Sequence, residues 1–129
     1  MYLLDTNVCI DFARARSDRL RERIETSFDR GLALSAITLA ELRVGASRSS
    51  NSRDNERLLE LLIHALELHD FDSPAAEYYG EIARRVGVRR HSFDRLIAAH
   101  AASLDLTLVT SDVRGFADVP GLKVEDWTQ

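Results

Sequence analysis

Thr107-Leu108-Val109-Thr110-Ser111-Asp112 contains the clearest strand of the chain and places an acid two residues after it. Its β-branched and apolar residues form a short run, which predicts a buried strand rather than a helix. A second short run, Tyr2-Leu3-Leu4, ends directly at Asp5. In open parallel sheets, sites form where the carboxyl ends of the strands emerge. The residues after each strand are therefore the first candidates for function.

Short apolar runs alternate with helical patterns along the rest of the chain. Further strands are predicted at 32–34, 67–71 and 122–124. Helices are predicted at about 17–30, 35–46, 53–66, 73–87 and 92–104, several with a capping Ser or a closing Gly. The chain between strands is long enough for helical crossovers. We therefore expect an α/β fold with helices on both faces of a mainly parallel, four- to five-stranded sheet.

Size and composition favour one ordinary globular domain spanning 1–129. The chain has 129 residues, of which 45% are hydrophobic and 29% are charged. Its net charge of −4 neither indicates nor excludes a nucleic-acid partner. Cys9 is the only cysteine, so an internal disulfide and a Cys-based zinc site are excluded. No signal peptide or membrane-length apolar run is recognisable, so we expect a soluble, cytoplasmic protein without a membrane partner.

Four acids are expected to converge at the carboxyl edge of this sheet. Asp5 and Asp112 follow strands, Glu41 lies in the helix after the second strand, and Asp94 lies in the first turn of the helix before the fourth. Carboxylates gathered in a partly dry cleft repel one another unless a cation lies among them. An all-oxygen set without Cys, and without His at metal-ligand spacing, indicates Mg²⁺ or Mn²⁺ rather than zinc.

Each acid also has a purely structural explanation. Asp5 and Asp112 could cap helices, and Asp94 could complement a helix dipole. Glu41 is harder to explain in this way, because it lies mid-helix on a face that should be partly buried and therefore needs a partner, for which an arginine is one candidate. His100, in an apolar helix, is expected to be a packing residue rather than a ligand.

Four segments together resemble the PIN-domain proteins, and in particular the VapC ribonuclease toxins of bacterial toxin–antitoxin pairs. These segments are Leu3-Leu4-Asp5-Thr6-Asn7, Leu34-Ser35-Ala36-Ile37-Thr38-Leu39-Ala40-Glu41-Leu42 with Gly45, Asp94-Arg95-Leu96-Ile97-Ala98-Ala99-His100-Ala101, and Leu108-Val109-Thr110-Ser111-Asp112 with Phe116. The terminal Pro120-Gly121-Leu122 and Trp127 also fit. The resemblance spans the whole chain, and it implies a PIN-like α/β/α sandwich.

The resemblance also implies an activity, namely Mg²⁺-dependent hydrolysis of RNA phosphodiester bonds. Asp5, Glu41, Asp94 and Asp112 would be the catalytic and metal-binding acids. Thr6, Asn7 and Thr110 would support them through hydrogen bonds, although capping explains Thr6 and Asn7 equally well. A small VapB-type antitoxin and a homodimer are implied as well. The Leu-rich helices at 36–46 and 58–66 could supply the apolar surface for both, unless those residues form an ordinary core.

The sequence around the third acid departs from many relatives. His91 stands where they have glycine, so the turn before Asp94 could be altered, or His91 could contact phosphate. Arg84, Arg85, Arg89 and Arg90 precede Asp94 and are candidate RNA-binding residues together with His91, although Arg84 and Arg85 could equally occupy a solvated helix face. The arginines between 14 and 23 are expected to be helix-surface charge balanced by neighbouring acids. A PIN-like module that binds RNA or protein without cutting is the alternative function.

Overall fold

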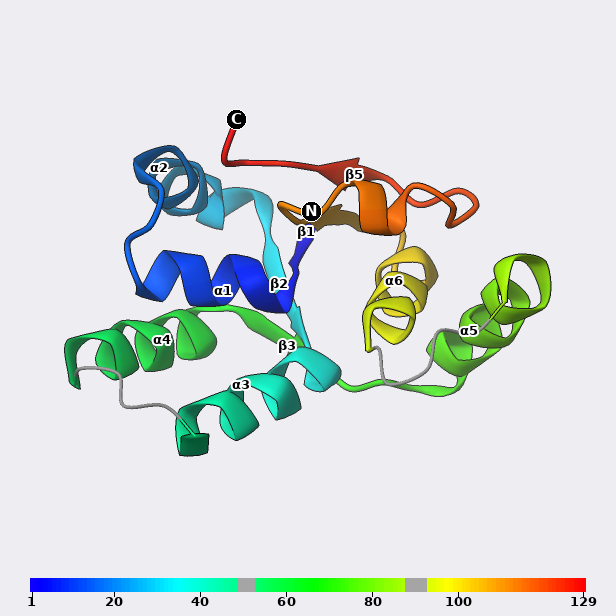
Figure 1. Cartoon of the computed structure of the whole chain (residues 1–129), viewed down its shortest axis with the longest axis horizontal. Helices are drawn as coiled ribbons and strands as arrows, with labels where there is room; N and C mark the ends of the chain where they lie inside the picture. The colour runs from blue at the N-terminus through cyan, green and yellow to red at the C-terminus, as the bar shows by residue number, and fades with distance from the viewer. Residues whose placement is uncertain (49–52, 88–92) are drawn as a thin grey trace.

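The computed structural model describes residues 1–48, 53–87 and 93–129, and a five-stranded sheet runs through its centre (Figure 1). The strand order is β3-β2-β1-β4-β5, and every neighbouring pair is parallel. The strands are β1 (Tyr2–Leu4), β2 (Leu32–Ser35), β3 (Glu67–His69), β4 (Thr107–Val109) and β5 (Val124–Glu125). The parallel α/β fold predicted from the sequence is confirmed, including its fifth strand. The prediction for β5 begins two residues too early, and that for β3 extends two residues too far.

One face of the sheet is covered by four helices and one 3-10 turn (Figure 1). They are α1 (Thr6–Ala13), α2 (Asp18–Ser27), η1 (Phe28–Arg30), α3 (Ala36–Arg48) and α4 (Arg53–Ala65). Their buried side chains form one apolar cluster with the inner strands, which includes Leu4, Val8, Leu34, Leu62 and Trp127. The predicted Leu-rich helices therefore contribute to the core, although Val44 and Leu61 remain 50% and 62% exposed.

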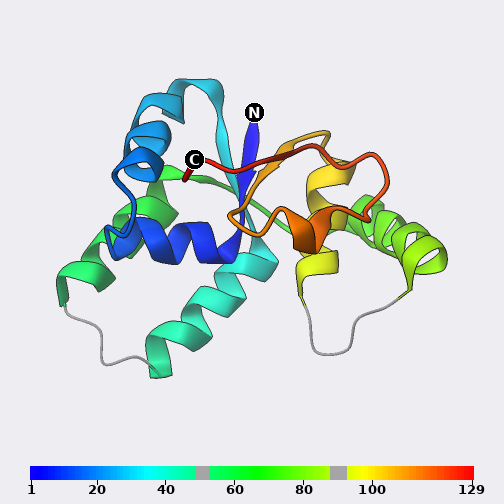
Figure 2. The ribbon, with the colours of Figure 1, turned by 45° about the horizontal axis from the view of Figure 1, so that its top comes forward.

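The other side of the sheet carries α5 (Ser73–Val86), α6 (Asp94–Ser103) and η2 (Arg114–Phe116) (Figure 2). Their buried side chains form a second apolar cluster with the sheet. Ile97 and Ala98 of α6 are fully buried there against Leu3 and Leu108 of the sheet. Between Asp94 and Ala101 most side chains are buried, because this helix packs between the sheet and α5. In the described parts of the chain, no helix is long and apolar enough to cross a membrane.

Three local details differ from the sequence prediction. The helix α1 was not predicted, since its eight residues provide too little apolar periodicity to stand out. Asp72, rather than Ser73, caps α5, because its carboxylate accepts the Ala75 N–H at 3.1 Å. Ser92, the predicted cap of α6, lies outside the described residues.

The chain order around the sheet fixes where a site can form. From β1 the chain crosses to β2 and then β3 on one side, whereas β4 and β5 lie on the other side of β1. The chain thus adds strands to one side of β1 first and to its other side afterwards, and the order of the strands reverses between the neighbouring strands β1 and β4. Ligands bind outside the carboxyl ends of the strands at such a point. Asp5 and Thr110 are the residues that directly follow these two strands.

Candidate metal-dependent active site

Asp5 is the buried centre of the candidate site. Its side chain caps α1 by accepting the Thr6 N–H at 2.8 Å, and its other oxygen accepts the Thr110 hydroxyl at 2.9 Å. Only 4% of the residue is exposed. Asp5 therefore does cap α1, as considered from the sequence. Capping involves only one of its two carboxylate oxygens, and it does not explain why a carboxylate is buried at the edge of the sheet.

The electrostatic environment of Asp5 opposes its negative charge. The pKa of its carboxyl is raised from a usual 3.8 to about 6, mainly because the group is buried, and the charges of Asp94 and Glu41 contribute to this rise. The hydrogen bonds from Thr110 and Thr6 act in the opposite direction but do not compensate. Three of the four predicted acids thus lie close enough to interact. A cation bound beside Asp5 would relieve this cost.

Glu41 has a hydroxyl partner rather than the arginine considered from the sequence. The Thr6 hydroxyl donates to Glu41 Oε1 at 2.7 Å and lies 3.2 Å from the Thr38 hydroxyl. One hydroxyl carries one proton, so Thr38 donates to Thr6 while Thr6 donates to Glu41. Thr38 is fully buried one turn before Glu41 on α3, and sequence reasoning gave it no role. Its i−3 spacing from Glu41 was the available signal.

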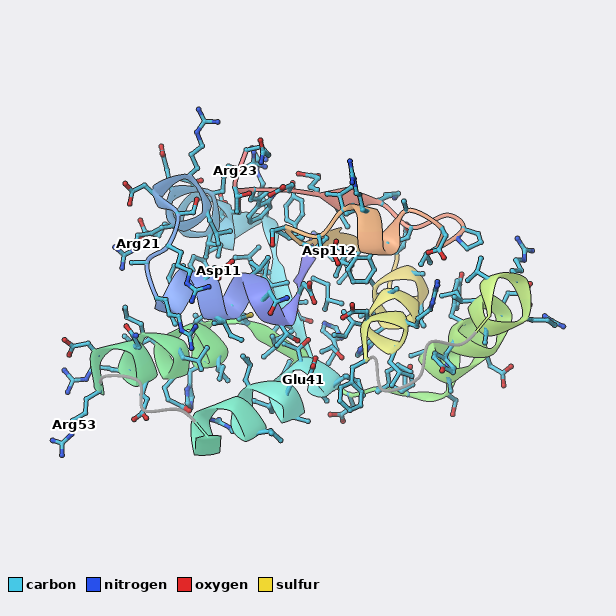
Figure 3. The ribbon with its side chains drawn as sticks, in the orientation of Figure 1. Asp11, Arg21, Arg23, Glu41, Arg53 and Asp112 are labelled. Carbon is cyan, nitrogen blue, oxygen red and sulfur yellow. The ribbon has the colours of Figure 1, made fainter. Side chains whose placement is uncertain are left out.

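Asp112 lies at the rim of the site. Its N–H donates to the Thr110 hydroxyl at 3.0 Å, which ties it to the same hydroxyl that binds Asp5. Its carboxylate is exposed and accepts the Gly115 N–H at 3.1 Å. A Cβ on Gly115 would lie 2.3 Å from Asp112 Oδ2, so this carboxylate position requires glycine. Figure 3 shows Asp112 on the segment before η2 and Glu41 on α3.

The other predicted members of the site are placed less tightly. Asp94 lies half-buried in the first turn of α6, as predicted, and it acts on Asp5 through its charge. Asn7 is exposed in the first turn of α1, so its supporting role stays a prediction. Asp112 is not among the charges that raise the pKa of Asp5. The structure therefore brings Asp5, Glu41 and Asp94 together and leaves Asp112 at the edge.

The donor chemistry fits a hard divalent cation. The groups around Asp5 are carboxylates and hydroxyls, and the buried negative charge beside two further acids needs compensation. Within residues 1–48, 53–87 and 93–129, no three His, Cys, Asp or Glu side chains are already gathered at metal-binding distance. The assignment of these acids to a metal thus stays a prediction supported by charge and donor type.

The predicted RNA-binding arginines are partly described. Arg84 and Arg85 are exposed on α5, and both pair with Glu81, as expected for a solvated helix face. Arg89, Arg90 and His91 lie outside the described residues. Two of the arginines between 14 and 23 pair with nearby acids, as predicted for surface charge: Arg16 with Asp11, and Arg21 with Glu25. Arg23 differs, because it pairs with Glu125 of β5 and lies over the Trp127 ring. In Figure 3, Arg53 at the start of α4 extends away from the molecule.

His100 is a buried packing residue, as the sequence indicated. Its Nδ1 lies 2.7 Å from the Ser35 hydroxyl, and its ring contacts Phe71 edge to face. The Ser35 hydroxyl also accepts the Ile37 N–H at the start of α3. Burial lowers the pKa of His100, which favours the neutral ring. The contact joins α6, which carries Asp94, to the start of the helix that carries Glu41.

Comparison with known proteins agrees with this fold. The family model for the PIN domain matches residues 2–122. The chain belongs to the PIN domain family. Among curated PIN proteins of the VapC type, it is 37% identical to the tRNA(fMet)-specific endonuclease VapC of Salmonella typhimurium, over 98% of this chain and 97% of that protein. It is 34% identical to Ribonuclease VapC2 of Rickettsia felis, over 98% of each.

A solved PIN structure superposes on almost the whole chain. The crystal structure of VapBC2 from Rickettsia felis, bound to a DNA fragment from their promoter, matches with a TM-score of 0.85 and 33% identity, over 98% of each chain. The resemblance to VapC ribonucleases that the four sequence segments indicated is therefore confirmed, and so is the PIN-like α/β/α architecture.

Proposed function

We propose that this PIN protein is a Mg²⁺-dependent endoribonuclease toxin that a small VapB-type antitoxin neutralises. The observation that carries the proposal is the environment of Asp5, a buried carboxylate whose pKa is raised to about 6 beside Asp94 and Glu41 at the winding reversal of the sheet. Structural acids on a helix cap have no need for two further acids nearby. The similarity to proteins named as VapC ribonucleases supports the reaction and the RNA substrate.

In this proposal Asp5, Glu41, Asp94 and Asp112 hold Mg²⁺, or Mn²⁺ in its place. The bound ion supplies the Lewis acidity for hydrolysis of a phosphodiester at neutral pH. The Thr110 hydroxyl orients Asp5, and the Thr6 hydroxyl orients Glu41, through hydrogen bonds to their carboxylates. Thr38 aligns the Thr6 hydroxyl. Asn7 supports the same edge from the first turn of α1.

The partners follow from the same reading. The similarity of this chain to the VapBC2 crystal structure supports a VapB-type antitoxin as partner. The exposed Val44 and Leu61 offer apolar surface on α3 and α4, either for this antitoxin or for a second copy of this chain. We also propose a homodimer, which predicts elution at twice the chain mass at micromolar concentration.

The proposed contacts to the RNA phosphates are Arg84, Arg85, Arg89, Arg90 and His91. The cytoplasm is the proposed location, since the RNA substrate is there.

Cleavage of total cellular RNA tests the proposal. Purified chain freed of any antitoxin is incubated with Mg²⁺, with EDTA, and with Asp5→Asn in place of the wild type. We expect discrete fragments that require both Mg²⁺ and Asp5, while the exposed Asp105→Asn serves as the matched control and cuts like the wild type. No cleavage by the folded wild type would favour the binding module without nuclease activity. Cleavage by Asp5→Asn would place the activity elsewhere.

A further inference from the structure

Arg95 is the only buried arginine or lysine in the parts of the chain that the structure describes, with 5% of the residue exposed. Its two terminal nitrogens bind both carboxylate oxygens of Asp118, at 3.1 and 2.8 Å. This fork geometry restricts both the distance and the orientation of the two groups. The other ion pairs of the described chain that involve an arginine or Lys123 are formed by cations at least 39% exposed. The pair thus differs from ordinary surface charge.

The pair joins the two segments that carry the outer acids. Arg95 directly follows Asp94 in the first turn of α6, and Asp118 lies six residues after Asp112. On the same segment, Phe116 and Val119 are buried in the apolar cluster that includes Ile97 of α6. The segment from Asp112 to Val119 is therefore held on α6 by an apolar contact, which fixes its distance, and by a bidentate ion pair, which fixes its rotation and register.

Stability is a weak reason for such a pair. A buried guanidinium loses its hydration, and Arg95 Nε has no hydrogen-bond partner among the described residues. The Asp118 side chain is 44% exposed, so solvent screens the attraction that would offset this cost. A directional pair does, however, specify one arrangement among several. Asp112 needs such specification, because its exposed carboxylate is bonded to Gly115 of the same segment. Its position relative to Asp94 depends on how this segment lies on α6.

We infer that Arg95 and Asp118 form a positioning pair that sets the Asp112 segment against the Asp94 end of α6 and so completes the acidic site. The inference rests on the proposed metal-dependent activity. The pair touches neither substrate nor metal and acts only through the placement of Asp112. Its loss should therefore weaken metal binding and turnover while leaving RNA binding largely unchanged.

The test replaces Arg95 by Met, which keeps an apolar stem of similar length and removes the fork. Three quantities are measured on folded protein: the affinity for Mn²⁺ alone, kcat and KM for RNA cleavage, and amide hydrogen exchange of residues 112–119. We expect about 10-fold weaker Mn²⁺ binding and about 10-fold lower kcat, with KM within about two-fold, since groups that orient metal ligands have effects of this size. Exchange at 112–119 should rise.

Two further variants complete the design. Asp118→Asn keeps the shape of the side chain, serves if Arg95→Met does not fold, and should show the same pattern. The double variant should be no worse than Arg95→Met, because the two residues act as one unit. Lys123→Met is the matched control, since it breaks an exposed ion pair with Asp105 (3.2 Å) and should leave all three quantities unchanged.

The outcomes separate this inference from the proposed function. Unchanged Mn²⁺ affinity and kcat in folded Arg95→Met would overturn the positioning role and leave a merely structural pair. If the wild type neither binds Mn²⁺ nor cleaves RNA, the proposed function fails. In that case hydrogen exchange decides alone: faster exchange at 112–119 in Arg95→Met supports the placement of the segment by the pair, and unchanged exchange overturns it.

Discussion

The two halves of the acidic site are built in different ways. The inner cluster, which consists of Asp5, Thr6, Thr38, Glu41 and Thr110, is linked by side-chain hydrogen bonds between β1, α1, α3 and the end of β4. Of the two outer acids, Asp94 is half-buried and Asp112 is exposed. The segments that carry them are held together by the Arg95–Asp118 ion pair and by apolar packing. The inner cluster is preorganised at the cost of a buried charge, whereas the outer acids depend on the packing of two segments.

This difference separates two requirements of a metal-dependent site. A buried carboxylate aligned by hydroxyls reorganises little when a cation binds, so most of its cost is already present in the free protein. Exposed acids at the rim remain hydrated and can adjust to a bound ion or substrate. Substitutions in the inner cluster should therefore change both stability and activity, and substitutions at the rim should change activity alone.

The largest effect is expected from the loss of an inner charge. Glu41→Gln keeps the shape of the side chain and removes one of the negative charges of the proposed metal site, so RNA cleavage should fall by about 100-fold or more. Initial rates of cleavage at saturating Mg²⁺ measure this. Glu77→Gln, an exposed acid on α5, is the control and should match the wild type. Activity of Glu41→Gln within about three-fold of wild type would remove Glu41 from the site.

Asp5→Asn should stabilise the metal-free protein at high pH. The folded-state pKa of about 6 lies above the usual 3.8, so the wild type is favoured while Asp5 is protonated and loses that stability as pH rises from about 4 through 6. This pKa shift corresponds to a change in the free energy of unfolding of at most about 3 kcal/mol. The substitution also alters the hydrogen bonds of Asp5 with Thr6 and Thr110, which reduces the gain. We therefore compare the free energy of unfolding of Asp5→Asn with that of the wild type at each pH. The difference should favour Asp5→Asn by about 1 to 2 kcal/mol more at pH 8 than at pH 4.

Urea unfolding in EDTA at the two pH values measures this gain. Asp105→Asn, an exposed aspartate, should show a difference close to zero between the same two conditions. If the stability of Asp5→Asn relative to wild type were the same at pH 4 and pH 8, Asp5 would carry no buried charge to relieve.

A smaller effect is expected when the hydroxyl that aligns Glu41 is lost. Thr6→Val keeps the size of the side chain but leaves Glu41 and Thr38 without their shared partner, which should lower cleavage by about 10-fold. Steady-state kinetics measures this, and Thr26→Val is the matched control, because that hydroxyl bonds only to carbonyls of its own helix in the described structure. Equal losses in both variants would show that the Thr6 hydroxyl has no special role.

The smallest effect concerns the rim. Gly115→Ala places a methyl group against the Asp112 carboxylate and should rotate it away, with a loss of activity of about three-fold and little change in stability, because the side chain is exposed. Cleavage rates and thermal unfolding, compared with Gly80→Ala in open space on α5, measure this. A loss as large as that of Glu41→Gln would mean that the rim acids contribute as much as the inner cluster.

The sequence by itself determined the parallel sheet and the acids at its edge. Buried strands such as Leu108-Val109 are visible because their apolar character is local, and the acids after them are visible because strand ends are local as well. The four family segments then indicated the PIN fold. Asp5 and Glu41 could therefore be chosen as site residues without any structure, and Glu41 could be recognised as a partly buried acid in need of a partner.

Only the tertiary structure decided which groups those acids contact. Thr6 meets Glu41 across 35 residues, Thr110 meets Asp5 across 105, and Arg95 meets Asp118 across 23. The family resemblance indicated Thr6 and Thr110 as supporting groups but not their individual partners, and no local pattern distinguishes Arg95 from the other arginines. Their partners depend on how helices pack on the sheet, which is set by the sum of many apolar contacts rather than by any one segment. The alignment of the site, unlike its acids, is therefore a property of the folded chain.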